Sequence, residues 1–390
     1  MAVQRKQETK ENVYPHSQAK LDLYKNYLLH YLKVLSLTPY CSKINLFDIF
    51  CGIGVYKDGN IGSPIITNNC IRETNEVIQN LGKQLKPITV TINDYEEDKI
   101  NNVQAILEAN KNNNCVYEYF NKDADNMLDI VASKVNSFKT SERSLVFIDP
   151  YGYSHITSNK IYDLIKNEHT EIILFLPVMQ MYRFADIALT DTERACYEDL
   201  RKFIFSFFPS THKIHSDKLS NVFEFIHEIK QALSFDNKFY TCSHYIERGK
   251  NNYYALFFIT SNLYGLDKMV EAKWKLDPVK GKGFTQKKAP TLFDTEFEET
   301  DNKRELEFLK EILFSFIKQG RIVTNAEIYE LSLVNEFRAT HAKAVLDDLI
   351  KHKKIEPCDL QGNYLDTAGA YYLDYNNYKK SPNKVNFKIK

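Results

Sequence analysis

The stretch "LFDIFCGIGVY", residues 46–56, decides the fold class. An apolar run ends in Asp48, and a loop with two glycines, Gly52 and Gly54, follows at once. Such glycines let a ligand approach the backbone closely, although a plain strand-to-helix turn would also use them. The pattern therefore predicts a nucleoside or amino-acid site at the carboxyl end of a buried strand, with Phe50 and both glycines beside it.

Bulk composition describes an ordinary globular protein. The chain has 390 residues, of which 43% are hydrophobic and 26% charged, and its formal net charge is zero. This length predicts two domains. The balanced charge argues against nucleic-acid binding that depends on net charge alone. Seven cysteines without a CxxC pair predict reduced thiols. The histidines lack the spacing of metal ligands, so the sequence predicts no metal site. Without a signal peptide or a membrane-length apolar run, we expect a cytoplasmic protein with no membrane partner.

Seven β-like runs give the expected order of the sheet. Five alternate with helix-length segments and predict a parallel sheet covered on both faces: 44–50, 87–94, 115–120, 144–150 and 171–177. The last two runs, 238–247 and 252–261, are separated by "RGKN" and predict an antiparallel hairpin. A Rossmann-like α/β sheet that ends in such a hairpin is the arrangement of class I S-adenosylmethionine (SAM) methyltransferases.

The domain organisation is predicted from the spacing of apolar residues and from helix-capping and turn signals. Residues 17–36 repeat apolar side chains at helical spacing. A capping box, Thr324 with Glu327, starts the second of three helices near the C-terminus, and residues 354–375 around "QGN" are expected to form a two-stranded wing. The predicted parts are a helical extension (1–36), a methyltransferase-like domain (37–285) with a helical insertion (178–235), a winged helix-turn-helix (300–376) and a mobile basic tail (377–390).

Two acids follow the next strands. Asp94 ends the second strand, where Rossmann-type sheets place an acid against the ribose hydroxyls, but Asp94 could also cap a helix that begins at Glu96. Asp123 follows the third strand and is the preferred acceptor from an adenine amino group, with Asp125 as the second choice. A solvated turn is the alternative for this segment.

The word "FIDPYG", residues 147–152, is the most informative about chemistry. Amino-group methyltransferases carry [DNS]PP[YF] here, where the acid and the proline carbonyl accept hydrogen bonds from the target amine. Asp149 and Pro150 match, and Tyr151 or Tyr153 would supply the stacking ring. The competing interpretation is a β-turn that leaves a buried strand.

The C-terminal helices offer a second candidate surface. Arg338, His341 and Lys343 lie opposite the apolar stripe of the expected recognition helix. Contact with DNA or with a protein would explain them equally well, because any exposed helix face is polar.

Taken together, these segments resemble a known family. "KLDLYKNYLLHYL", "DIFCGIG", "GSP", "KDADN", "FIDPYG" and "GLDKMVEAKWKLDP" with Trp274 are similar to the three-Cys-motif partner proteins (TcmP), over roughly residues 15–375. The resemblance implies a class I methyltransferase-like core, a C-terminal winged helix-turn-helix and a separate partner with three cysteines, of an iron–sulfur, radical-SAM-like kind. Cys51 replaces the alanine that is common in the family's glycine loop.

These residues predict a SAM-dependent methyltransferase that acts on an amino group, in particular that of a nucleobase in DNA or RNA. Asp48, Gly52 and Gly54 would hold the methionine end of SAM. The rival hypothesis is an inactive methyltransferase-like module that docks a partner or DNA. NAD-dependent redox chemistry is a third and weaker hypothesis, because Lys57 stands where GxGxxG needs its last glycine.

Overall fold

A computed structural model describes residues 15–112, 114–217, 219–249, 251–284 and 294–390. Residues 1–14 of the predicted N-terminal extension lie outside this range, as do residues 285–293. The described chain divides into two compact units. The sheet unit contains residues 15–239, 245–261 and 284, and the C-terminal unit contains residues 240–244, 262–283 and 294–390.

The large sheet has the predicted mixed arrangement. Its strand order is β3-β2-β1-β4-β5-β7-β6-β8, and the pairs among β1 to β5 are parallel, whereas β7 runs antiparallel to β5. The strands are β1 (Lys43–Asp48), β2 (Ile88–Asn93), β3 (Cys115–Phe120), β4 (Glu142–Ile148), β5 (Thr170–Leu176), β6 (Tyr240–Glu247), β7 (Tyr253–Thr260) and β8 (Gly283–Phe284). All seven predicted runs are therefore confirmed, and the order matches a Rossmann-like methyltransferase fold.

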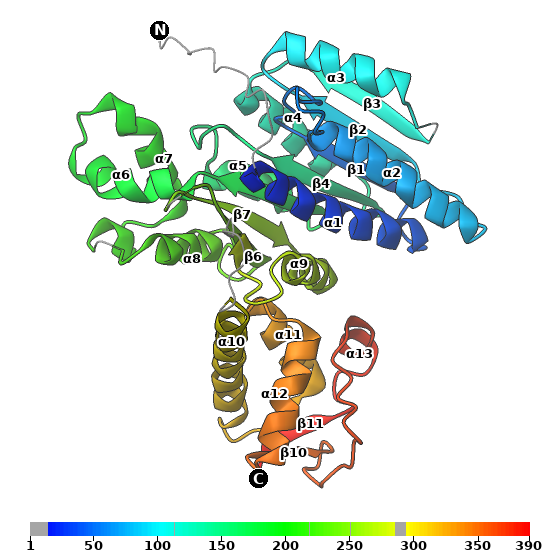
Figure 1. Ribbon diagram of the computed structural model, residues 1–390, viewed down its shortest axis with the longest axis vertical. Helices are drawn as coiled ribbons and strands as arrows, with labels where there is room; N and C mark the ends of the chain where they lie inside the picture. The colour runs from blue at the N-terminus through cyan, green and yellow to red at the C-terminus, as the bar shows by residue number, and fades with distance from the viewer. Residues whose placement is uncertain (1–14, 113, 218, 250, 285–293) are drawn as a thin grey trace. The chain divides into compact units, whose positions relative to one another are not determined.

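Helices connect the parallel strands (Figure 1). Those of the sheet unit are α1 (Pro15–Leu37), α2 (Ser63–Asn80), α3 (Glu97–Ala109), α4 (Ala124–Ser137), α5 (Ser158–Ile165), α6 (Val178–Thr190), α7 (Glu198–Phe207) and α8 (Val222–Ala232). The order of strands reverses at β1 and β4, because β2 and β3 extend from one side of β1 and β5 from the other side of β4. Ligands of open α/β sheets bind at the carboxyl ends of the strands at this point.

Helix α1 confirms the expected amphipathic pattern. Tyr24, Tyr27, Leu28 and Leu32 are buried almost completely. The Tyr24 ring packs 4.4 Å from the ring of Phe147 on β4, which fixes α1 against the sheet. Helix α1 also lies beside α2, so it is packed against both the sheet and a neighbouring helix (Figure 1).

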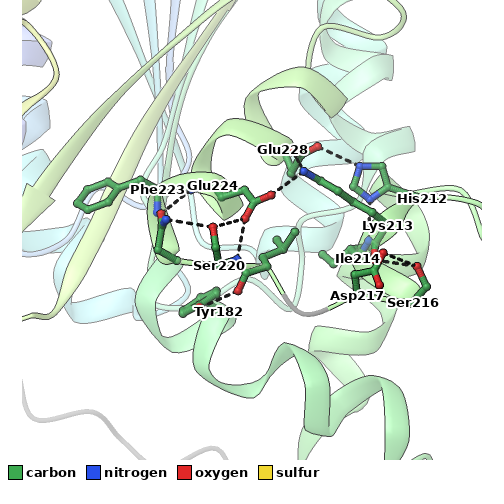
Figure 2. A network of polar contacts seen from close by, with 12 residues as sticks. Tyr182, His212, Lys213, Ile214, Ser216, Asp217, Ser220, Phe223, Glu224 and Glu228 are labelled. Carbon is green, nitrogen blue, oxygen red and sulfur yellow. Dashed lines mark hydrogen bonds and ion pairs between the residues drawn. The ribbon is translucent and has the colours of Figure 1, made fainter.

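The predicted helical insertion contains α6, α7 and α8. Figure 2 shows the polar network that joins the loop before α8 to the helix itself. Lys213 Nζ lies 2.7 Å from Glu224 Oε1 and 2.9 Å from Glu228 Oε1. His212 Nε2 lies 3.0 Å from Glu228 Oε2, while His212 Nδ1 accepts the Ile214 N–H. The network holds the loop in place and leaves its charges paired.

The C-terminal unit contains helices and a small antiparallel sheet. Its elements are α9 (Leu263–Leu276), α10 (Asp294–Ile317), β9 (Val323–Thr324), α11 (Asn325–Val334), α12 (Ala339–Lys351), β10 (Ile355–Cys358), α13 (Tyr375–Lys380) and β11 (Asn386–Ile389). The capping box of Thr324 and Glu327 is present and begins α11, as predicted. The three predicted helices are α10, α11 and α12.

The end of the chain differs from the expectation. The order of the small sheet is β10-β11-β9, so the tail that we expected to be mobile supplies its middle strand, with Phe387 fully buried. The turn around "QGN" does form, since the Leu365 N–H donates to Pro357 O at 3.0 Å. However, β10 pairs along its length with β11, and the only β-bridge described between β10 and the second half of the predicted wing joins Cys358 to Tyr364. Composition alone missed this strand because its partner is distant in the sequence.

Trp274, in the "KWKLDP" segment, has a structural role in the C-terminal unit. Its indole N–H donates to Glu336 O at 2.8 Å, and its ring lies 4.1 Å from that of His341. Gly281 has φ +64°, and a Cβ there would stand 2.3 Å from the indole. Asp277 accepts four backbone N–H groups from the loop that contains this glycine. The segment therefore packs α9 within the C-terminal unit.

Candidate functional site

Three predicted acids lie at one edge of the large sheet. Asp48 ends β1, and in the parallel registers it pairs with Ile92 of β2 and Phe147 of β4. Asp94 and Asp149 each follow two residues beyond those partners, so all three carboxylates lie at the carboxyl ends of neighbouring strands. The prediction that acids gather where the strand order reverses is met in this arrangement.

Asp48 is the most unusual of the three. Its side chain is buried, with 3% of the residue exposed, and no donor among the described residues reaches either carboxylate oxygen with hydrogen-bond geometry. Burial raises the pKa of Asp48 to about 7, although the nearby Ser63 hydroxyl favours the ionised form. The charges of Asp149 and Asp94 raise this pKa further. The Ser63 hydroxyl and the Phe50 backbone N–H lie near this carboxyl without forming hydrogen bonds of normal geometry. A buried acid that is so weakly bound is costly, and a cationic or donor ligand would relieve that cost.

The glycine loop serves two different purposes. Gly52 has φ +67°, and a Cβ there would meet nothing within 4 Å among the described residues. Gly54 has φ +79°, but a Cβ there would lie 2.9 Å from Val103 Cγ2 on α3. Gly54 is therefore required by helix packing, whereas Gly52 presents bare backbone to open space beside Asp48. Phe50, the other predicted residue of this loop, is half-buried and packs on the sheet core.

Asp94 has protein partners on both carboxylate oxygens. Oδ2 accepts the Gly52 N–H at 3.0 Å, and Oδ1 accepts the Glu96 N–H at 3.0 Å. The capping interpretation is not confirmed, because Glu96 is the N-cap of α3 and the bond from its N–H to Asp94 closes a turn directly before the helix. The bond to Gly52 also ties the tip of β2 to the glycine loop. Each oxygen retains a second lone pair, so contact with ribose stays a prediction.

Lys99 neutralises this side of the site. Its Nζ lies 2.8 Å from Glu96 Oε1 and 3.7 Å from Asp94 Oδ1. Burial opposes the charge on Lys99, yet the hydrogen bond to Glu96 and the charge of Asp94 outweigh it and raise the pKa. The same Nζ is 3.3 Å from Tyr151 Oη and 5.2 Å from the centre of that ring. Tyr151 is 63% exposed, so its other face is free to stack on a planar ligand.

The acids after β3 are used by the protein itself. Asp123 is the N-cap of α4: Oδ1 accepts the Asn126 N–H at 3.0 Å. That hydrogen bond lowers the pKa of Asp123. Asp125 binds Lys160 Nζ, and its Oδ2 lies 2.7 Å from His155 Nδ1. The role of Asp123 toward adenine stays a prediction that must compete with the helix cap.

Asp149 has a partner that the sequence does not reveal. Lys20 of α1 donates from Nζ to Asp149 Oδ2, across 129 residues of chain. The two side chains are 13% and 21% exposed. The adjoining Pro150 is buried, and the partly buried Tyr153 meets Phe203 of α7 edge-on with ring centres 6.4 Å apart, so its stacking role stays a prediction.

Asn93 is a positioning residue that the sequence analysis missed. Its Nδ2 donates to Ile49 O at 3.0 Å and to Lys122 O at 3.1 Å, and its Oδ1 accepts the Lys122 N–H. This buried amide joins the tips of β1, β2 and β3. The only signal in the sequence is an amide next to Asp94 at the end of an apolar strand.

The predicted nucleic-acid residues lie at the start of α12 in the C-terminal unit. His341 Nδ1 accepts the Arg338 N–H at 3.3 Å, and its ring packs on Trp274. Burial lowers the pKa of His341 to about 4, so this side chain is neutral at pH 7 and is unsuited to bind phosphate as a cation. Lys343 is exposed but lies 3.0 Å from Asp347 Oδ2. Nucleic-acid contact through these residues stays a prediction.

Other features limit the chemistry. Among the residues that the structure describes, no group of three His, Cys, Asp or Glu side chains could hold a metal ion. The seven cysteines are free thiols. Across the described ranges, we find no helix that combines the length and apolar character needed to cross a membrane.

Comparison with known proteins adds little to this description. No protein-family model matches the chain, and no curated protein matches it. Similar solved structures include the bifunctional kinase-methyltransferase WbdD (10% identity, TM-score 0.31, 62% of this chain and 39% of that one). They also include magnesium protoporphyrin IX methyltransferase from Synechocystis PCC 6803 with bound S-adenosylhomocysteine (11%, 0.29, 64% and 89%) and loganic acid methyltransferase with S-adenosylhomocysteine (10%, 0.28, 79% and 94%).

The three are methyltransferases by name, but likeness at these identities and TM-scores carries no argument about this chain. The chain spans 39% of the length of WbdD, so it resembles only part of that protein. The fold assignment therefore depends on strand order and direction in the chain itself.

Proposed function

We propose that the sheet unit binds SAM at the tips of β1 and β2 and transfers its methyl group to an amine held at the tip of β4. The observation that carries the proposal is the buried Asp48 carboxyl, which has no described partner with hydrogen-bond geometry and precedes the loop in which Gly52 exposes its backbone. A ligand with an ammonium group and a flat nucleoside would satisfy both features.

The residues fit the parts of SAM by chemistry. Asp48 would accept from the ammonium group of the methionine moiety, and the Gly52 backbone would lie along it. Asp94 would accept from ribose through its remaining lone pairs. Asp123 would accept from adenine only weakly, because its carboxylate also caps α4. When bound, SAM supplies an electrophilic methyl group on sulfur. The protein's own task is to bind, to orient the acceptor and to exclude water.

The proposed acceptor is an amino group, in particular that of a nucleobase in DNA or RNA. Asp149 and the Pro150 carbonyl would accept hydrogen bonds from the amine, and the exposed ring of Tyr151 would stack on the base. The C-terminal unit would act as a winged helix-turn-helix that positions the nucleic acid through Arg338 and Lys343. A three-Cys-motif protein of iron–sulfur, radical-SAM-like type is the proposed partner, on the basis of the sequence resemblance.

One observation favours a second function, a methyltransferase-like module that binds a partner or DNA without turnover. Asp149 is already paired with Lys20, so the carboxylate that should hold an acceptor is occupied in this structure. Under this alternative the ion pair is permanent and holds α1 on the sheet.

Two measurements test the proposal. Calorimetry should detect SAM binding to the wild-type protein and a loss of affinity in Asp48→Asn. Affinity should be unchanged in Asp125→Asn, whose carboxylate lies after β3 and is already paired with Lys160. Transfer of labelled methyl groups to DNA or RNA, with and without the partner, should then separate the two functions. Binding without transfer to any acceptor would support the inactive module, and equal affinity in Asp48→Asn would reject the cofactor site.

A further inference from the structure

We infer that Lys20 is a methylation site of this protein, modified by the sheet unit to which it belongs. This inference rests on the proposed function, in which Asp149 holds the acceptor nitrogen. The amine that Asp149 holds in the structure is Lys20 Nζ. If the first assignment is right, Lys20 occupies the acceptor position, and its nitrogen is the group presented for methyl transfer.

The surroundings of Lys20 are those of an amine-binding site. Its Nζ is paired with Asp149 and lies 4.8 Å from the centre of the Phe175 ring on β5. The ring of Tyr254 stacks on Phe175 at 5.4 Å with an interplanar angle of 5°. A carboxylate combined with an aromatic face recognises ammonium and methylated ammonium groups, because the ring quadrupole attracts the cation without needing its N–H bonds. The site therefore suits Lys20 both before and after methylation.

Helix α1 holds Lys20 in this position by contacts further along the same face. One turn on, Tyr24 Oη lies 2.8 Å from Thr67 Oγ1 of α2. In the next turn, Tyr27 donates to Glu171 Oε2 at the start of β5. These buried contacts fix the register of α1, so the pairing of Lys20 with Asp149 does not depend on a freely moving side chain.

The reaction balances with SAM as the only co-reactant. The Lys20 ammonium loses a proton to water, and the Nζ lone pair forms a bond to the methyl carbon. The bond between that carbon and sulfur breaks, and sulfur keeps its electron pair, which leaves S-adenosylhomocysteine.

The chain provides two internal controls. Lys25 lies on the same helix and is exposed, so it reports chemical alkylation that needs no site. Lys134 resembles Lys20 more closely: Nζ lies 2.5 Å from Glu118 Oε2 and 5.1 Å from the Phe120 ring. Its carboxylate belongs to the body of β3 and not to the tip of β4, so Lys134 tests whether the position or only the local chemistry matters.

The experiment is mass spectrometry of the full-length protein after incubation with SAM. We expect added methyl groups on Lys20 and none on Lys25 or Lys134, at a rate constant that is independent of protein concentration. Asp149→Asn should slow the reaction by about 10- to 100-fold while it retains SAM affinity, since it removes one charge-assisted hydrogen bond. Lys20→Arg keeps the cation beside Asp149 and should carry no added mass at position 20.

Several results would overturn the inference. These are an unmodified Lys20 in protein that binds SAM, equal modification of Lys134, and a rate constant that rises with protein concentration. A protein that binds no SAM would reject the proposed function, and the inference with it. An unmodified Lys20 with measured SAM binding rejects the inference alone, and the ion pair would then serve only to hold α1.

Discussion

The tips of β1 and β3 carry aspartates in opposite circumstances. Asp48 is buried without a described partner of hydrogen-bond geometry, and its pKa is raised to about 7. Asp123 is half-buried, accepts from the Asn126 N–H and amide, and has a lowered pKa. The protein thus already uses the carboxylate of Asp123 to cap a helix, whereas it leaves that of Asp48 for a ligand. Position at a strand tip is therefore not sufficient to identify a binding residue.

The largest expected effect is on the pH dependence of folding. The Asp48 carboxyl binds its proton more tightly in the folded state, since its pKa rises from 3.8 to about 7. Its stabilising contribution is fully present below pH 3.8 and is lost as pH rises through 7. Between pH 5 and pH 8 the loss should be about 3 kcal/mol, and Asp48→Asn should remove it. Denaturant unfolding of both proteins measures this difference. Parallel pH profiles for the two would show that burial does not perturb Asp48.

Affinity for SAM should separate the same two aspartates. Asp48→Asn removes the charge offered to the methionine ammonium, and we expect about 10- to 100-fold weaker binding. Asp123→Ala should bind SAM within about twofold of the wild-type protein, because its carboxylate is engaged by α4. Calorimetry measures both. A greater loss in Asp123→Ala would reverse the comparison and restore the predicted contact with adenine.

The role of Asn93 in joining the carboxyl ends of β1, β2 and β3 can also be tested. Asn93→Ala leaves Ile49 O and both backbone groups of Lys122 without their side-chain partner, and should cost about 2 kcal/mol of unfolding free energy. Asn136→Ala is a matched control, because this exposed amide donates to two carbonyls away from the site. Its effect should stay within about 0.5 kcal/mol. Similar losses in both variants would remove the positioning role of Asn93.

The smallest effect concerns the helix cap. Asp123→Ala should lower the unfolding free energy by about 1 kcal/mol, because α4 loses its N-cap. Asp123→Asn keeps the capping oxygen and should change stability by only a few tenths of a kcal/mol. Thermal or denaturant unfolding distinguishes them. An Asn variant as unstable as the Ala variant would mean that charge, and not capping, is what Asp123 supplies.

Local patterns predicted the sheet and the position of its acids. The strands, the hairpin, the amphipathic helix α1 and the capping box before α11 follow from periods and caps that a few neighbouring residues define. The same patterns placed Asp48, Asp94 and Asp149 at one edge, because parallel strands share their carboxyl ends.

What the sequence could not provide depends on long-range partners. The pairing of Lys20 with Asp149 joins residues 129 positions apart, and β11 pairs with a strand about thirty residues earlier. The helix cap formed by Asp123 was not predicted, and the turn that Asp94 closes before α3 was expected only as a cap, since an acid before a helix can serve the backbone or a ligand equally well. The half-buried place of His341 against Trp274 needed the packing of α9, which polar periodicity on α12 does not encode.

The central claim is that the buried carboxyl of Asp48 receives the methionine end of the cofactor. The most direct test is calorimetric titration of the wild-type protein with S-adenosylhomocysteine at pH 6.5, in two buffers with different ionisation enthalpies. Most Asp48 carboxyls carry a proton at this pH, so binding of an ammonium group should release part of it. We predict binding heats that differ between the buffers in wild type and agree in Asp48→Asn. Absence of binding, or identical heats in both buffers for the wild-type protein, would contradict the account.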